Sequence, residues 1–249
     1  MGMLARIGAY EYDLEQGFAI CIPFHQGPDQ VNCYYAPPFS VSPVVMGDFT
    51  GEISSGAPVN YRNISVNPHG NGTHTECLAH ISDADLDVHA ALTDSFFPVQ
   101  VLTIAPHRLT NGDQVLRFRE AEILPEIKAL AIRSLPNTSD KQHRAYSGTN
   151  PPYLDAACVA LLPDLGIDHL LIDLPSVDKE EDGGALAAHK AFWNFASVKR
   201  THATITELIF IPDHIKDGRY LLNLQIAPFR TDASPSRPIL FPLQKNNHR

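Results

Sequence analysis

The sequence predicts a single-domain α/β fold, and three observations support this prediction. Apolar segments rich in β-formers recur along the chain, and two segments with helical spacing lie between them. No linker-like stretch of glycine, serine or charge divides the 249 residues. The length and the 44% apolar content allow one large core. We therefore expect one domain over residues 1–249.

The N-terminal part of the chain is predicted to form short strands and loops. Its first 65 residues contain many prolines and glycines and show little helical periodicity. Residues 18–24 and 41–46 are apolar runs bounded by glycine or proline, a pattern typical of short buried strands. We expect these two segments to open the sheet.

Five more strands and two helices are expected after residue 95. The apolar segments that predict strands are residues 97–105, 129–135, 169–174, 207–212 and 220–227. Helices are expected over residues 152–165 and 185–195, and Gly166 is placed to end the first of them. Pro235, Pro238 and Pro242 indicate an irregular tail packed on the body.

Composition argues against nucleic acid and membranes as partners. The net charge is -9, and no run of Lys and Arg is interleaved with aromatic residues. No apolar stretch reaches the ~18 residues of a membrane span, and the N-terminus lacks the pattern of a secretion signal. The four cysteines are isolated, with no CxxC pair. We expect a cytoplasmic protein with free thiols and a small-molecule substrate.

One histidine-rich stretch stands out as a candidate for chemistry. Residues 67–81 read NPHGNGTHTECLAHI and hold His69, His74 and His80 together with Glu76. In an extended chain His74 and Glu76 point the same way, and Glu76 and His80 lie one turn apart once a helix begins. Imidazole and carboxylate groups together suit zinc, manganese or a related divalent ion. The stretch therefore favours a metal site.

A second interpretation of the same stretch is purely structural. Thr73 and Glu76 fit the capping box of a helix N-terminus, in which Glu76 bonds back to the backbone. A single His69 or His80 would more commonly make an ordinary surface or core hydrogen bond. Their joint occurrence shifts the balance toward a metal site, although the spacing by itself is not diagnostic.

The stretch resembles the signature HxGTHxDxPxH of the cyclase-like, metal-dependent hydrolase family, which includes bacterial kynurenine formamidase and isatin hydrolase. Residues 165–178 (LGIDHLLIDLPSVD) and 188–190 (AHK) are similar to a second family block. Residues 204–208 (TITEL) and 234–238 (SPSRP) are similar to its later blocks. The resemblance implies a swivelling β/β/α fold, a mixed sheet closing toward a barrel with outer helices, usually as a homodimer or homotetramer.

By this resemblance, His69, His74 and Glu76 would bind a first ion. Glu76, His189 and Glu207 would bind a second ion or complete the same coordination sphere, and His80 would be the proton shuttle. The resemblance implies one or two divalent ions, with Zn²⁺ expected first and Mn²⁺ as the alternative.

Three positions depart from the family signature. Gly70 and Asn71 both lie between His69 and the GTH motif, where the family has one residue, so a local bulge must return His69 to the ion. Glu76 replaces the usual aspartate, which lengthens the arm by one methylene and leaves the metal count open. Leu78 stands where the family often has proline.

The function implied by the resemblance is metal-dependent amidohydrolysis of a carbon–nitrogen bond other than a peptide bond. The substrate would be an amide, formamide or cyclic amide, as in an arylformamidase, and metal-activated water would attack it. Two alternatives remain: a non-catalytic metal-containing binding protein, and a ring-forming cyclase or dehydratase. A nucleophilic role for Cys77 is disfavoured, because its side chain points away from those of Glu76 and Leu78 in an extended chain.

Several further residues are candidates for supporting roles. His202 is a competing ligand near Glu207, whereas His89 and His143 are expected at the surface. Candidate pocket residues are Phe24, Tyr34, Tyr35 and Phe39, and candidate loop-ordering residues are Asp173, Ser176 and Asp178.

Overall fold

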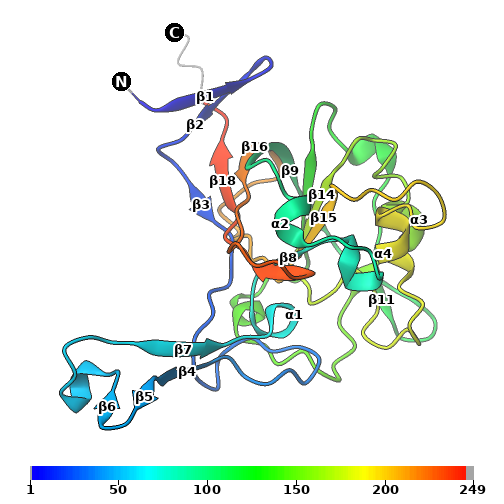
Figure 1. The fold of residues 1–249 in the computed structure, drawn as a ribbon. Coiled ribbons are helices and arrows are strands. Elements are labelled where there is room, and N and C mark those ends of the chain that lie inside the picture. The colour runs from blue at the N-terminus through cyan, green and yellow to red at the C-terminus, as the bar shows by residue number, and fades with distance from the viewer. Residues whose placement is uncertain (1, 245–249) are drawn as a thin grey trace.

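The body of the protein is built on one nine-stranded mixed sheet, seen in a computed structural model that describes residues 2–244. The strands lie in the order β17 (Ala233–Pro235), β8 (His74–Glu76), β15 (Thr204–Glu207), β14 (His169–Ile172), β12 (Ala129–Ser134), β9 (Phe96–Ile104), β16 (Gly218–Asn223), β18 (Ile239–Pro242) and β3 (Phe18–Ala19). Strands β9, β12, β14 and β15 run parallel, and the flanking strands pair antiparallel. The sheet curls toward a half barrel (Figure 1).

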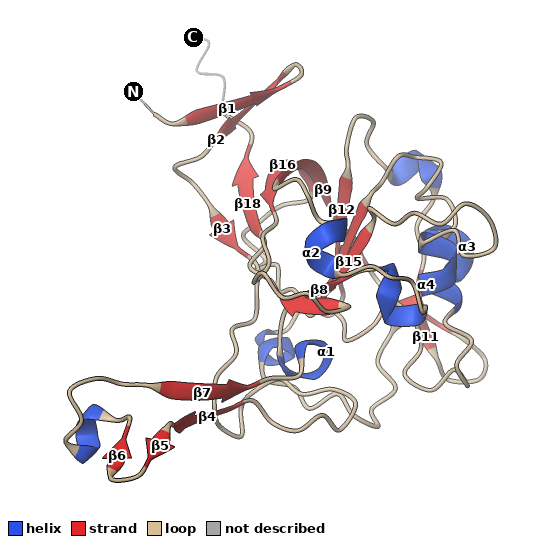
Figure 2. Cartoon of the chain, viewed as in Figure 1, coloured by secondary structure: helices blue, strands red, loops and turns tan. Residues whose placement is uncertain are grey.

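Both faces of the central strands are buried, which explains their continuous apolar sequences. Along β12, Leu130 and Ile132 point into one core, and Ala129 and Ala131 point into a second core on the opposite face. The first core packs against α3 (Ala156–Val159) and α4 (Ala187–Phe192), which lie on the same side of the sheet (Figure 2). Among residues 2–244, no helix has the length and apolar character needed to cross a bilayer.

Smaller elements surround this body. They are the hairpin of β1 (Leu4–Ile7) and β2 (Tyr10–Asp13), the sheet of β10 (His107–Arg108), β11 (Gln114–Leu116) and β13 (Tyr153–Leu154), the short helices α1 (Pro68–Asn71) and α2 (Val88–Ala91), and the 3₁₀ turns η2 (Leu78–Ile81), η3 (Glu120–Glu122) and η4 (Ser139–Gln142).

A separate arm extends away from the body (Figures 1 and 2). It consists of β4 (Ser40–Pro43) paired with β7 (Arg62–Ser65), β5 (Val45–Met46) paired with β6 (Phe49–Thr50), and the turn η1 (Ile53–Ser55). Residues 41–46 were predicted to form a buried strand that opens the sheet, and this prediction is wrong. Val45 is 64% exposed and Met46 57% exposed. Apolar composition predicted a strand here, but this strand lies outside the core.

Most expected strands are confirmed, with shifts at their ends. Residues 97–105, 129–135, 169–174 and 220–227 overlap β9, β12, β14 and β16, respectively, and β9 and β16 begin one and two residues earlier than expected. The strand expected over residues 207–212 instead ends at Glu207. Beyond it, Leu208 and Ile209 still donate backbone hydrogen bonds to Leu174 and Ile172, and Ile209 forms an isolated bridge with Cys21. The prediction of an irregular tail around Pro235, Pro238 and Pro242 is also wrong, because this part of the chain forms β17 and β18. Pro235 is tolerated because β17 is an edge strand.

Both helices are shorter than their sequence patterns predicted. Tyr153 and Leu154 pair with β11, so α3 begins only after Asp155, whose side chain accepts from the backbone of Ala157. Helix α4 begins after Leu186 and ends before Asn194, and both of these residues have positive φ. Left-handed backbone thus bounds α4, whereas strand pairing shortens α3 at its start.

Burial of His169 predicts a loss of stability in mild acid. Its ring packs on Phe97, its Nδ1 lies 2.9 Å from the Thr204 hydroxyl, and burial lowers the pKa of His169 to about 4. As the pH falls, His169 is therefore protonated in the unfolded chain before it is protonated in the folded protein. Its contribution to the free energy of unfolding is fully present above pH ~6.5 and is lost toward pH ~4. We expect a loss of about 2 kcal/mol between pH 7 and pH 5.

Urea unfolding at the two pH values, compared with His169→Gln, measures this contribution. The variant is expected to lack this part of the pH dependence, and His107→Gln, at an exposed histidine, is expected to keep it. An equal loss in the wild type and in His169→Gln would contradict the assignment to His169.

Candidate metal centre

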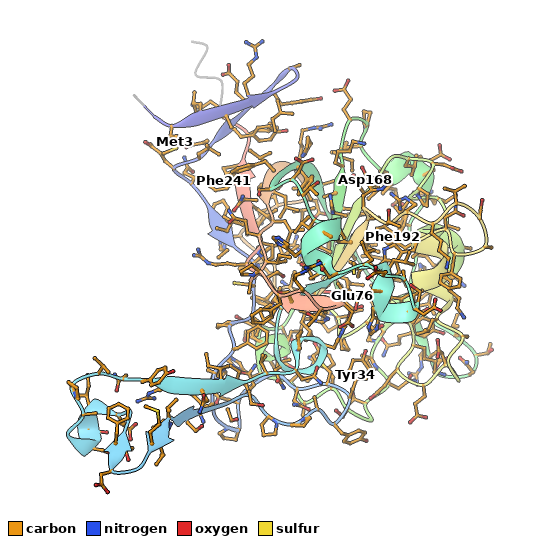
Figure 3. The ribbon with its side chains drawn as sticks, viewed as in Figure 1. Met3, Tyr34, Glu76, Asp168, Phe192 and Phe241 are labelled. Carbon is orange, nitrogen blue, oxygen red and sulfur yellow. The ribbon has the colours of Figure 1, made fainter. Side chains whose placement is uncertain are left out.

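Three elements bring the candidate ligands together. Strand β8 pairs antiparallel with β15, and the register places Glu207 opposite His74. His74 and Glu76 lie two residues apart on β8, so they share one face of the strand. His189 reaches the same point from α4, with Nε2 3.0 Å from Glu76 Oε1. Glu76 lies near the centre of the molecule, below α2 (Figure 3).

His69 also reaches this point, in spite of the additional residue before the GTH motif. The segment forms the one-turn helix α1, in which the Asn67 side chain accepts from the backbone N–H of Gly70 at 3.0 Å. Asn71 is buried, and its side chain accepts from the backbone N–H of Asn67 at 2.8 Å. The turn takes up the additional residue and leaves His69 Nδ1 3.2 Å from Glu76 Oε2.

The close packing of α1 requires glycine at one position. A Cβ atom on Gly70 would lie 2.3 Å from Cβ of Ala36 and 3.1 Å from the carbonyl oxygen of Cys33. Any side chain there would push α1 away from the loop beneath it, and His69 with it.

The structure gathers the other five sequence-predicted residues around Glu76. In addition to the contacts of His69 and His189, His80 Nε2 lies 3.7 Å from Glu76 Oε2. The Nε2 atom of His74 lies 3.5 Å from Glu207 Oε2, and that of His189 lies 3.9 Å from Glu207 Oε1. His69, His74 and Glu76 each offer one ligand atom, and these atoms lie within 4.8 Å of one another.

Two buried atoms in this cluster have no hydrogen-bond partner among the described residues. They are His74 Nε2 and Glu76 Oε2. Both have neighbours within 3.2–3.5 Å, but none with the angles of a hydrogen bond. A buried polar atom left without a partner costs about 1–3 kcal/mol. Nitrogen and oxygen atoms that converge without bonding one another fit a divalent cation.

The hydrogen bonds of His69, His74 and His189 support the same interpretation. In each ring, one nitrogen faces the cluster and the other, the outward nitrogen, bonds a group outside it. His74 Nδ1 lies 3.0 Å from the Gly72 carbonyl oxygen, His189 Nδ1 lies 2.6 Å from Asp178 Oδ2, and His69 Nε2 lies 2.9 Å from Asp232 Oδ2. If each of these nitrogens donates its hydrogen, the lone pair of the other nitrogen faces the cluster. Metal-binding histidines in proteins are oriented in this way.

Electrostatics at the centre favour positive charge. Burial acts to raise the pKa of Glu76, but His80, His189 and His69 outweigh it and hold that pKa well below its usual value. Burial acts to lower the pKa of His69 and of His189, yet their carboxylate neighbours raise each to about 10. Two buried carboxylates, Glu76 and Glu207, thus need cationic partners at this point.

His80 differs from the other histidines because solvent reaches it. Its side chain is 31% exposed, whereas those of His74 and His189 are buried. Its ring stacks on His69 with centroids 4.2 Å apart, and its Nδ1 lies 3.3 Å from Asp232 Oδ2. The other ring nitrogen, Nε2, faces Glu76.

Two residues at the centre were not assigned to it from the sequence. Asp178 was expected only to order a loop, but it also accepts from the backbone N–H groups of Ala188 and His189 and thereby ties the start of α4 to the His189 ring. Asp232 carried no signal beyond its place just before the SPSRP segment. Asp173 lies elsewhere, bonded to Lys141 and Ser134.

The capping box at Thr73 and Glu76 and the competing ligand His202 are both contradicted by the structure. Glu76 lies in β8 and not in the first turn of a helix, so Thr73 and Glu76 form no capping box. His202 is exposed and bonds Asp168 instead of joining the cluster. Cys77 is fully buried, and burial raises the pKa of its thiol to about 11, which disfavours the thiolate that a nucleophile requires.

The candidate pocket residues differ in their contacts and in their exposure. Phe24 packs against Gly72 and contacts the ring of Phe39, with centroids 6.0 Å apart. The hydroxyl of Tyr34 donates to the carbonyl of Pro175 at 3.0 Å, and burial and the Glu207 carboxylate raise the pKa of Tyr34. Tyr35 is largely exposed.

Comparison with known proteins shows the family of this chain. Residues 12–179 match the family model Cyclase, described as "Putative cyclase". The kynurenine formamidase of Delftia acidovorans is 26% identical over 213 residues, which cover 81% of this chain and 92% of the relative.

Solved structures show the same fold. A potential metal-dependent hydrolase with cyclase activity superposes with a TM-score of 0.64 at 16% identity, over 91% of this chain and 97% of its own. Isatin hydrolase A from Labrenzia aggregata superposes with a TM-score of 0.62 at 15% identity, over 92% and 94%. The expected mixed sheet closing toward a barrel is confirmed. The chain belongs to the cyclase family.

Proposed function

We propose that the protein is a metal-dependent hydrolase that cleaves the C–N bond of an amide, formamide or cyclic amide. The observation that carries this proposal is the pair of buried atoms without hydrogen bonds, His74 Nε2 and Glu76 Oε2, at a point surrounded by imidazoles and carboxylates. The kynurenine formamidase and isatin hydrolase relatives support the choice of bond.

His69, His74, Glu76, His189 and Glu207 would hold the metal, with Zn²⁺ favoured and Mn²⁺ as the alternative. When bound, a divalent ion would supply Lewis acidity, lowering the pKa of water and polarising a carbonyl oxygen. The side-chain carboxylate of Glu207 is also fixed by the backbone, because its Oε1 accepts from the N–H of Val177 at 3.0 Å. The ligands would therefore change little in position on binding.

His80 is placed to move the proton. Its Nδ1–H donates to Asp232 at 3.3 Å, so Nε2 is the nitrogen that can react. This atom would accept a proton from water as the water oxygen adds to the carbonyl carbon. It would then return the proton to the nitrogen as the C–N bond breaks, which yields a carboxylic acid and an amine.

Turnover of a defined substrate panel tests this role. We expect His80→Ala to lower turnover of N-formylkynurenine, isatin or a cyclic imide by ~10²–10⁴-fold, because general acid–base catalysis is lost. Metal content measured by atomic emission is expected to stay unchanged. His202→Ala, at an exposed histidine outside the centre, is the matched control and is expected to keep both properties.

The same panel separates the alternatives. Unchanged turnover in His80→Ala would remove the proton-transfer role, and loss of metal would make His80 a ligand. Metal binding without turnover of any substrate would favour a binding protein, and ring closure or loss of water without hydrolysis would favour a cyclase or dehydratase.

We also propose that the chain forms a homodimer or homotetramer in which the arm of one copy packs on a second copy. Within residues 40–65, all of them described, Gly51 alone is buried. The large apolar side chains exposed over half or more of their surface are Val45, Met46, Ile53, Val59, Tyr61 and Ile64. Two-stranded hairpins are marginal alone in water, and monomers rarely expose such patches. The arm, residues 40–65, has about as many residues as each partner contributes to a standard protein–protein interface, ~20–30.

Light scattering tests this assembly. The wild type is expected to exceed the 27.4 kDa of one chain, because association buries the apolar side chains of the arm. The triple variant Val45→Ser, Met46→Ser, Ile64→Ser is expected to be monomeric with an unchanged far-ultraviolet circular dichroism spectrum. Asn63→Ser, on the same arm, is the control that should still assemble. A wild type that stays monomeric at a protein concentration of about 100 μM would rule the assembly out.

A further inference from the structure

One oxygen atom, Oδ2 of Asp232, contacts two histidines of the centre. It lies 2.9 Å from His69 Nε2 and 3.3 Å from His80 Nδ1. The two rings are stacked, so the carboxylate meets the same edge of both. Each ring presents its other nitrogen to Glu76 Oε2, at 3.2 Å from His69 and 3.7 Å from His80.

The backbone holds Asp232 in this place. Its carbonyl oxygen accepts from the N–H of Cys77 at 3.0 Å, and the next residue, Ala233, pairs with Glu76 across β17 and β8. The carboxylate is thus placed relative to Glu76 by two adjacent strands and not by a free loop. A carboxylate fixed in this way can orient a histidine ring with little loss of entropy.

The shared contact selects the tautomer of both rings. An ionised carboxylate only accepts hydrogen bonds, so each histidine must give it an N–H. In its neutral form, which metal binding requires, His69 then carries its hydrogen on Nε2 and keeps the Nδ1 lone pair for the centre. Neutral His80 carries its hydrogen on Nδ1 and keeps Nε2 free. Without Asp232, neither ring has another hydrogen-bond partner among the described residues that would select these tautomers.

Direct coordination by Asp232 is the competing possibility, because His69, His80 and Asp232 also lie close enough to hold an ion. In that arrangement His69 would turn its Nε2 to the metal and lose its hydrogen-bond acceptor. Glu76 Oε2 and His74 Nε2 would still be buried without partners. The positioning role satisfies more of the buried polar atoms than coordination does.

We propose that Asp232 is a positioning residue that orients a metal ligand, His69, and the acid–base group, His80, with one oxygen atom. The part concerning His80 rests on the proposed hydrolase function, and the part concerning His69 does not. Loss of Asp232 should therefore weaken metal binding and, separately, slow turnover when the metal is saturating.

The test compares Asp232→Ala, Asp232→Asn and the control Asp85→Ala, which removes an exposed aspartate away from the centre. Zn²⁺ affinity is measured by competition with a chelator. We expect Asp232→Ala to weaken it ~10–100-fold, as for other carboxylates that orient metal-binding histidines. Asp232→Asn keeps one acceptor oxygen and is expected to recover part of the loss, and Asp85→Ala should match the wild type.

Kinetics at saturating Zn²⁺ test the link to His80. Asp232→Ala is expected to lower kcat ~10–100-fold with little change in KM, and to cause no further loss in a His80→Ala background. Equal losses of kcat in both backgrounds would show that Asp232 does not act through His80. Unchanged Zn²⁺ affinity would remove the role at His69, and a loss far beyond 100-fold that Asn does not rescue would identify a direct ligand.

Nuclear magnetic resonance tests the positioning role of Asp232 independently of whether the protein is a hydrolase. Two-bond ¹H–¹⁵N correlations of the Zn²⁺-loaded protein report the tautomer of each histidine. We expect the hydrogen on Nε2 of His69 and on Nδ1 of His80, with both assignments lost in Asp232→Ala. If the wild type shows these tautomers but hydrolyses no substrate, the hydrolase proposal fails and the positioning role stands. The opposite tautomers would overturn the positioning role even in an active enzyme.

Discussion

Compensation of the buried carboxylates of Glu76 and Glu207 is the constraint on which the site depends. Each buried carboxylate costs several kcal/mol unless positive charge and hydrogen bonds offset it. The pairing of β8 with β15 places both carboxylates near the same point, and histidines from α1, β8 and α4 surround them. The outward nitrogens of these histidines are already bonded, so their inward nitrogens are available to a cation. A divalent ion would complete this arrangement without a large rearrangement.

The fold supplies rigidity in the places where this arrangement needs it. The parallel strands β9, β12 and β14 are buried between two cores, and β15 extends that sheet to the site. Asp178 connects the backbone at the start of α4 with the ring of His189, so the position of the helix and the orientation of a ligand are set together. Asp232 connects the β17 edge with His69 and His80 in a similar way. Each histidine is thereby held by an element that the core already fixes.

The features that depend on local pattern could be predicted from the sequence. Continuous apolar runs predicted β9, β12 and β14, because strands buried on both faces need apolar residues throughout. The spacing of His74, Glu76 and His80 predicted that they face one point, whereas His189 and Glu207 came only from family resemblance. Asp232 could not be found from pattern, because its contacts depend on the long-range pairing of β17 with β8. The arm was misplaced because an apolar strand has the same composition in a core and on an exposed surface.

X-ray absorption at the metal edge of the Zn²⁺-loaded protein tests the central claim most directly. Ligation by the histidines and carboxylates around Glu76 predicts nitrogen and oxygen neighbours at about 2.0–2.2 Å, together with the outer-shell scattering of at least two imidazole rings. A protein that retains no zinc, or whose zinc has sulfur neighbours at about 2.3 Å, would contradict a centre built from these imidazoles and carboxylates.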